Sequence, residues 1–299
     1  MTRTPAFPPA HRPLGGGAIA IGLIGAGLLC QQVGSSLAVL LFPEVGPLGM
    51  VMLRLVVSAL ILLSVARPSL RGRTPGAWRA ALMFGTVLAL MNAMFYLALS
   101  ELPLGVAVTI EVLGPLALAV ITSKARSAWL WAVLAMLGIV ALGGGGWDRL
   151  TLPGVLFALA AAAGWAGYIL ASARVGRDFP KLDGLAFAMV VGAVLSLPFG
   201  LVDAGPALLR ADLLALGAAV ALLSSTVPYA LELIALRRLP PAVFGILMSL
   251  GPALAGVTGF ALLGQRLSPL EIFGIALVVL ASAGAVWVGR RQPEPHPVP

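Results

Sequence analysis

A carboxylate stands inside one of the most apolar stretches of this sequence. Glu111 lies in the middle of LPLGVAVTIEVLGPLALAV, residues 102–120. Four more polar side chains interrupt other apolar stretches, and they are Gln32, Arg54, Asn92 and Tyr96. A guanidinium can hold a carboxylate through two parallel hydrogen bonds, and a buried carboxylate can receive an ammonium group or a proton. Together these groups predict a binding site for a small molecule that carries both charges.

The elements that position these groups are predicted to be membrane-spanning helices. Of the 299 residues, 60% are hydrophobic and only 10% are charged, and the mean hydropathy is +1.04. An ordinary soluble domain carries about 25% charged residues. A bilayer is crossed by about 20 helical residues. The apolar blocks therefore predict an all-α polytopic membrane protein with ten spans, near residues 17–39, 48–66, 78–99, 103–122, 128–145, 153–172, 184–202, 211–234, 242–263 and 270–289.

Two of these spans begin with clear capping signals. Thr74 and Ser268 each stand directly before a proline, which favours an N-cap followed by proline in the first helical turn. Glu271 stands three residues after Ser268 and completes a capping box. The single cysteine, Cys30, excludes an internal disulfide.

The basic residues predict how the spans are oriented. With the N-terminus inside, fifteen Lys and Arg residues fall on the inner side, three fall on the outer side and Arg54 lies within a span. Cytoplasmic loops carry such an excess of positive charge. Both termini are therefore expected in the cytoplasm. The net charge of +8 marks membrane topology and does not indicate a nucleic-acid partner.

The five polar side chains are expected to converge at one level, in the outer half of the membrane towards its midplane. Glu111 lies about eight residues, or ~12 Å of helix, inward from the outer end of its span. An ionisable group at such a depth costs about 3 kcal/mol and normally faces the protein interior or a water-filled cavity. One alternative is that Arg54 and Glu111 pair and lock two spans together. Asn92 and Tyr96 could likewise serve only as hydrogen bonds between helices.

An internal repeat relates the two halves of the chain. The stretch LPLGVAVTIEVLGP, residues 102–115, recurs as LPPAVFGILMSLGP, residues 239–252, 137 positions later. Five spans in each half is an odd number, so the second half must be inverted in the membrane. Inverted repeats suit alternating access around a central site. The expected organisation is a cytoplasmic tail (1–16), a first repeat of five spans (17–146), a second and inverted repeat (147–289) and a cytoplasmic tail (290–299).

The two prolines that end these repeated stretches are expected to bend their helices. Proline lacks the N–H that would bond the carbonyl four residues earlier. Pro115 and Pro252 would therefore free the carbonyls of Glu111 and Met248, either for a ligand or for a packing kink. Glu232, beside two arginines at the inner end of its span, could help to form an inner gate or could be a plain ion pair. An apolar pocket for a substrate side chain could be lined by Trp165, Tyr168, Tyr229 and Phe244.

Three stretches carry a resemblance to a known family. They are MLRLVVSALIL (52–62), NAMFYLALSELPLGVAVTIEVLGPLALAV (92–120) and STVPYALELIALRRLPPAVFGILMSLGPALAG (225–256). Together with ten spans in a 5+5 inverted repeat, they resemble the drug/metabolite transporter superfamily of the EamA type. Within that superfamily they look most like the bacterial threonine/homoserine exporters, and the likeness extends over almost the whole chain.

The resemblance implies a multi-pass exporter of amino acids in the bacterial inner membrane. Threonine, homoserine and further amino acids, aromatic ones included, are the expected substrates. The expected partners are the substrate, the lipid bilayer and, as an open alternative, protons, with no cofactor and no metal. We expect a monomer or a weak dimer.

Two other classes of function are alternatives to amino-acid export. One is a transporter of organic cations or of another small metabolite, but a cation transporter would work with Glu111 alone and has no use for Arg54. An enzyme is disfavoured because the two histidines, His11 and His296, lie in the tails and no metal-binding cluster is present in the sequence.

Overall fold

The computed structural model describes residues 15–69, 71–123, 127–143, 150–180, 182–228, 231 and 247–290. Every regular element in these residues is a helix. Seven helical segments are long and apolar enough to cross a membrane, and three shorter apolar segments accompany them. Each of the ten predicted spans coincides with one of these segments. The prediction of an all-α polytopic membrane protein is thereby confirmed.

The helix bounds follow the predicted spans closely, with the fourth and eighth spans each divided in two. The helices are α1 (Gly15–Val45), α2 (Pro47–Ala66), α3 (Pro75–Glu101), α4 (Leu104–Glu111), α5 (Leu113–Thr122), α6 (Ala128–Gly143), α7 (Leu152–Asp178), α8 (Asp183–Ala204), η2 (Gly205–Leu209), α9 (Ala211–Ala221), η3 (Leu222–Thr226), α12 (Gly251–Leu263) and α13 (Pro269–Arg290). The short element η3 is a π-helix that continues α9.

Side chains that were predicted to cap helices do so. The hydroxyl of Thr74 accepts a hydrogen bond from the backbone N–H of Ala77 at 3.2 Å, at the start of α3. The backbone N–H of Ser268 donates to Glu271 at 2.6 Å, and the N–H of Glu271 donates to the Ser268 hydroxyl at 3.2 Å. This reciprocal pair is the capping box that the sequence predicted for α13.

The N-terminus of α2 is capped from another helix. Asp203, in the last turn of α8, accepts hydrogen bonds from the N–H groups of Leu48 at 2.8 Å and Gly49 at 3.2 Å. The chain turns into α2 through Gly46, whose φ of 68° lies in the left-handed region that favours glycine. The first turn of a helix leaves its N–H groups without partners, so this carboxylate joins the N-terminal end of α2 to the C-terminal end of α8.

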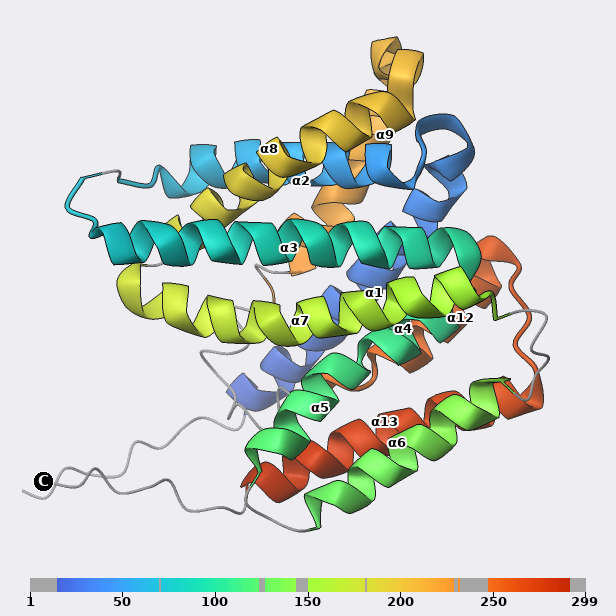
Figure 1. Ribbon diagram of the computed structural model, residues 1–299. Coiled ribbons are helices and arrows are strands. Elements are labelled where there is room, and N and C mark those ends of the chain that lie inside the picture. Colours follow the sequence, from blue (N-terminus) through green and yellow to red (C-terminus); the bar gives the residue numbers. More distant parts are fainter. Residues whose placement is uncertain are drawn as a thin grey trace, which may run out of the picture.

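The helices lie in tiers, with α2 and α8 on one side of the long helices α3 and α7, and with α4, α5 and α12 on the other (Figure 1). Helix α3 packs against α7 and α8, while α2 packs against α8. Helices α6 and α13 lie side by side and form one edge of the molecule. Helices α4 and α12 cross closely at two glycines. A Cβ built on Gly105 would stand only 2.9 Å from the Cα of Gly256. Small residues permit such approaches between helices in membranes.

Two spans are interrupted at matching places in the repeated sequence. Helix α4 ends at Glu111 and α5 begins at Leu113, shortly before Pro115. In the second copy, residues 247–248 are helical, residues 249–250 form a turn, and α12 begins at Gly251, directly before Pro252. Both interruptions lie two to three residues before the proline. Each directly follows the residue, four positions before the proline, whose carbonyl is left without its helical partner by the missing N–H.

Candidate functional site

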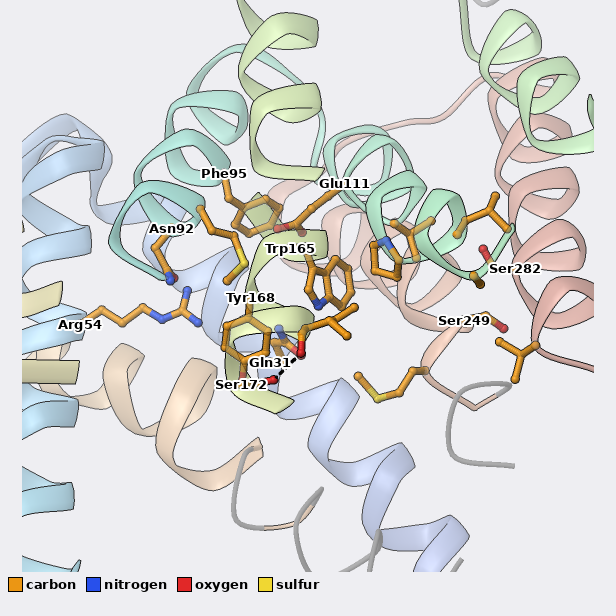
Figure 2. A pocket seen from close by; sticks show the side chains of 18 residues that line it. Gln31, Arg54, Asn92, Phe95, Glu111, Trp165, Tyr168, Ser172, Ser249 and Ser282 are labelled. Atoms are coloured by element: carbon orange, nitrogen blue, oxygen red, sulfur yellow. Dashed lines mark hydrogen bonds between the residues drawn. The ribbon is translucent and has the colours of Figure 1, made fainter. Parts of the chain in front are cut away.

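A cavity of about 490 Å³ opens beside the interruption between α4 and α5. Helices α1, α2, α3, α4, α5, α7 and α13 contribute to its wall, together with Met248 and Ser249 before α12. Three of the polar residues singled out in the sequence line it, namely Arg54, Asn92 and Glu111. Figure 2 shows Arg54 and Asn92 at one end of the cavity and Ser249 and Ser282 at the other.

Arg54 is buried, with 5% of its surface exposed, and joins three helices. Its Nε donates to the Ser225 hydroxyl at 2.6 Å, and its Nη2 donates to the carbonyl of Ser224 at 2.9 Å. Its Nη1 donates to the Tyr96 hydroxyl at 3.3 Å. Ser224 and Ser225 belong to the π-helix η3. Insertions of this kind inside α-helices are frequent at functional sites.

Tyr96 and Asn92 lie one helical turn apart on α3 but have different surroundings. Tyr96 is fully buried behind Arg54, its ring centroid 5.5 Å from the guanidinium carbon, and is absent from the cavity wall. Asn92 lines the cavity while its Nδ2 donates to the carbonyl of Leu88 at 2.8 Å. The structure therefore places Tyr96 as a support for Arg54 and leaves Asn92 facing the cavity.

Glu111 is the last residue of α4, and only 9% of its surface is exposed. The ion pairs of the described residues join Arg73 to Asp183 and Arg210 to Glu44 and Asp212. No ion pair joins Glu111 to Arg54 in this part of the chain, so the direct lock between the two spans is not formed in this structure. A buried carboxylate is costly unless a cation or a proton accompanies it. Glu111 borders the same cavity as Arg54, whose positive charge acts on it without a direct ion pair.

Gln32 does not line the large cavity. It lines a second chamber of about 20 Å³ that shares Glu111 with the large cavity. Its neighbour Gln31 lines both spaces and was missed in the sequence, although two adjacent glutamines in an apolar helix are a visible signal. Consecutive residues of a helix point about 100° apart, and the sequence alone did not show which glutamine would face the cavity.

Aromatic side chains from two helices form one wall of the large cavity. Phe95 comes from α3, and Trp165 and Tyr168 come from α7 (Figure 2). Ser172, Ser249 and Ser282 also line the cavity and were not singled out in the sequence. Serine is too common in apolar helices for its presence alone to predict a site. The candidates Tyr229, Glu232 and Phe244 lie outside the described residues.

The cavity extends from Glu111 in one direction along the molecule. Its wall continues to Ala119 near the end of α5, to Ser172 in the second half of α7 and to Val286 near the end of α13. These helix ends adjoin the loops that the sequence assigns to the cytoplasmic side. The cavity therefore continues from Glu111 towards the ends of these helices and the basic loops beyond them.

On the opposite side of Glu111 the helices close together. Gly105 of α4 meets Gly256 of α12, and the backbone N–H of Leu104 donates to the side-chain oxygen of Gln265 at 2.9 Å. Discontinuous helices that form a binding site near the middle of the membrane are a feature of many transporters.

The fold and the site therefore define a polytopic membrane transporter. The model of the EamA-like transporter family matches residues 152–287. The threonine/homoserine exporter RhtA of Salmonella typhimurium strain LT2 is 42% identical over 266 residues, which cover 88% of this chain and 90% of that protein. The RhtA exporter of Escherichia coli strain K12 is 41% identical over 264 residues, covering 87% and 89%. The chain belongs to the EamA-like transporter family.

More distant similarities agree with this assignment. An uncharacterized transporter of Bacillus subtilis strain 168, YwfM, is 27% identical over 72% of this chain and 76% of its own length. A solved crystal structure covers 92% of this chain and 100% of its own, with a TM-score of 0.57 and 21% identity, and it shows the common fold. The protein is a multi-pass protein of the bacterial inner membrane.

Proposed function

We propose that this protein exports amino acids across the inner membrane, with threonine and homoserine among its substrates. The observation that carries the proposal is the cavity, which presents a buried guanidinium and a buried carboxylate in a chain 42% identical to threonine/homoserine exporters. A free amino acid carries a carboxylate and an ammonium group. Arg54 would receive the carboxylate and Glu111 the ammonium, with Asn92 as a further hydrogen-bonding group.

The size of the cavity supports a broad range of substrates. Pockets of about 300–1,000 Å³ hold drug-sized ligands, and this cavity of about 490 Å³ falls within that range. Threonine would leave much of it filled with water. The aromatic wall of Trp165 and Tyr168 would suit larger apolar side chains, which extends the proposal to other amino acids, aromatic ones included.

Alternating access is the proposed mechanism, and it rests on the inverted repeat of five and five spans. The matching interruptions before Pro115 and Pro252 support that repeat. With both termini in the cytoplasm, the hollow side of the cavity faces inward and the closed contact between α4 and α12 faces outward. This arrangement would load an amino acid from the cytoplasm. Opening the outer contact while the inner helix ends close would release it outside.

Growth of an amino-acid-sensitive bacterial strain tests the proposal. The strain expresses the protein and is challenged in turn with threonine, homoserine, other amino acids and quaternary ammonium dyes. We expect the tolerated concentration to rise for threonine or homoserine and for several further amino acids. Tolerance that rises only for the dyes would replace the proposal with transport of organic cations.

A further inference from the structure

The small chamber behind the large cavity is a separate compartment with its own chemistry. Its volume of about 20 Å³ has room for a single water molecule or an ion of similar size. It lies between α1, the end of α4, Trp165 of α7 and the segment that leads into α12. Glu111 and Gln31 border both the chamber and the cavity.

A buried side-chain oxygen without a partner borders this chamber, beside other residues that carry oxygen atoms. Gln32 has only 4% of its surface exposed, and its Oε1 has no hydrogen-bond partner within the described residues. Ser35, one turn along the same helix, adds a hydroxyl to the wall. Pro115 and Pro252 cannot bond the carbonyls of Glu111 and Met248, and both of those residues line the chamber. Carboxylate, amide, hydroxyl and carbonyl oxygens are the ligands that hard cations prefer.

The charge of the chamber also favours a cation. Among the described residues that line it, Glu111 is the one charged side chain. Arg54 lines the large cavity but not the chamber. In other transporters, the C-terminal ends of half-helices and unwound carbonyls coordinate the coupling ion, and here α4 ends at Glu111. A proton would need the carboxylate alone, whereas Gln31, Gln32 and Ser35 add neutral acceptor groups to the wall of the same small chamber.

We propose that the chamber binds one dehydrated sodium ion, held by Glu111, Gln32 and Ser35. The shared carboxylate then links this ion to transport, a step that rests on the proposed function. Glu111 cannot neutralise an ammonium group in the cavity and a sodium ion in the chamber at the same time. The two ligands therefore exclude each other, which makes the protein an exchanger in which inward sodium movement drives amino-acid efflux.

The first experiment measures sodium binding by the purified protein in detergent. The melting temperature is recorded in sodium, potassium and choline chloride at constant ionic strength and pH. Sodium should raise it in a saturable way, because a ligand bound only by the folded state stabilises that state. Potassium and choline should not. Equal stabilisation by potassium, or none by sodium, would overturn the assignment, and the latter would leave the chamber as the site of a water molecule.

Two variants and a control locate the ion. Gln32→Leu keeps the size of the side chain but removes its oxygen, and it should lose the sodium-dependent rise. Ser35→Ala makes the same test if the first variant does not fold. Ser36→Ala is the control, because the Ser36 hydroxyl donates to the Gln32 carbonyl at 2.9 Å and does not line the chamber. An undiminished rise in either chamber variant would refute the site.

The second experiment tests mutual exclusion. Saturating threonine should weaken the apparent affinity for sodium by about tenfold, and saturating sodium should weaken that for threonine by the same factor. In proteoliposomes, an inward sodium gradient should accelerate threonine efflux compared with choline. Efflux that is equal in both salts would refute the coupling and leave amino-acid export standing. Sodium stabilisation without transport of any amino acid would refute export and leave the ion site standing.

Discussion

At the scale of single residues, two buried charges with different surroundings carry the proposed site. Arg54 is held by Ser225, Ser224 and Tyr96, so its position in the wall is fixed by three helices. Glu111 has no such hydrogen bonds among the described residues and borders both the cavity and the chamber. The fixed cation is suited to orienting a ligand, whereas the carboxylate is suited to exchanging one partner for another.

Neutralising Glu111 tests whether its carboxylate exchanges one partner for another. The change Glu111→Gln keeps the shape of the side chain and removes its charge. Export of threonine should fall about tenfold or more, because an ion-assisted hydrogen bond contributes about 1.5–3 kcal/mol. The melting temperature should stay the same or rise, since a buried amide is less costly than a buried carboxylate. Efflux from loaded cells and thermal melting measure the two effects, and full efflux by the variant would remove Glu111 from the site.

Replacing Arg54 tests the role of its guanidinium group, which donates hydrogen bonds to several partners at once. In Arg54→Lys, a single ammonium group cannot reach the two serines and Tyr96 together. We expect a loss of about 2 kcal/mol of stability along with reduced threonine export. Arg79→Lys, at an exposed position of α3, serves as the control and should change neither quantity. A variant Arg54→Lys that melts and transports like the parent protein would contradict the contacts described above.

At the scale of elements, the interrupted helices depend on close crossings. A Cβ built on Gly114 would overlap the carbonyl of Ala162, so α5 and α7 approach each other through a glycine. This crossing lies next to Pro115, which lines the cavity. The glycine therefore sets the distance between two helices that both face the site.

Adding one methyl group tests this crossing. Gly114→Ala should lower stability by about 2 kcal/mol, because overpacking forces the helix backbones apart. The matched control is Gly22→Ala in α1, where a Cβ meets nothing within 4 Å. The control should leave the melting temperature unchanged or raise it slightly, since alanine favours a helix more than glycine does. Equal melting of both variants would show that α5 and α7 can separate freely.

At the scale of the whole molecule, the direction of the cavity depends on the orientation of the bundle. Helix α3 runs from Pro75 to Glu101 and spans the full thickness of the bundle. Its first turns adjoin several arginines, whereas its last residue is acidic. The excess of basic residues on one side predicts that α3 begins in the cytoplasm and ends outside.

Two cysteines at opposite ends of α3 test this orientation. In a Cys30→Ala background, Glu101→Cys should react with a membrane-impermeant maleimide in intact cells. Arg79→Cys should react only after the membrane is made permeable. Both positions are exposed, so a difference in labelling reports the side of the membrane and not burial. The reverse pattern would turn the cavity outward and remove the structural support for loading from the cytoplasm.

Much of the architecture could be predicted from the sequence because its signals are local. Ten apolar blocks, the caps at Thr74 and Ser268 and the paired prolines each act through neighbouring residues of the chain. Burial of Arg54 and Glu111 also followed from the sequence, since ionisable groups within membrane spans almost always face the protein interior or a water-filled cavity.

The different positions and contacts of the polar residues depended on contacts between helices that are far apart in the sequence. Tyr96 and Asn92 share a helix face in sequence, yet one supports Arg54 and the other lines the cavity. Ser224 and Ser225 meet Arg54 across about 170 positions, and no local pattern predicts that approach. Gln31 and Gln32 are adjacent, and their side chains differ in the direction in which they leave the α1 axis. The sequence determined which groups leave the lipid, and tertiary packing decided which of them share a space, because helix rotation and crossing distance are set by neighbours far away along the chain.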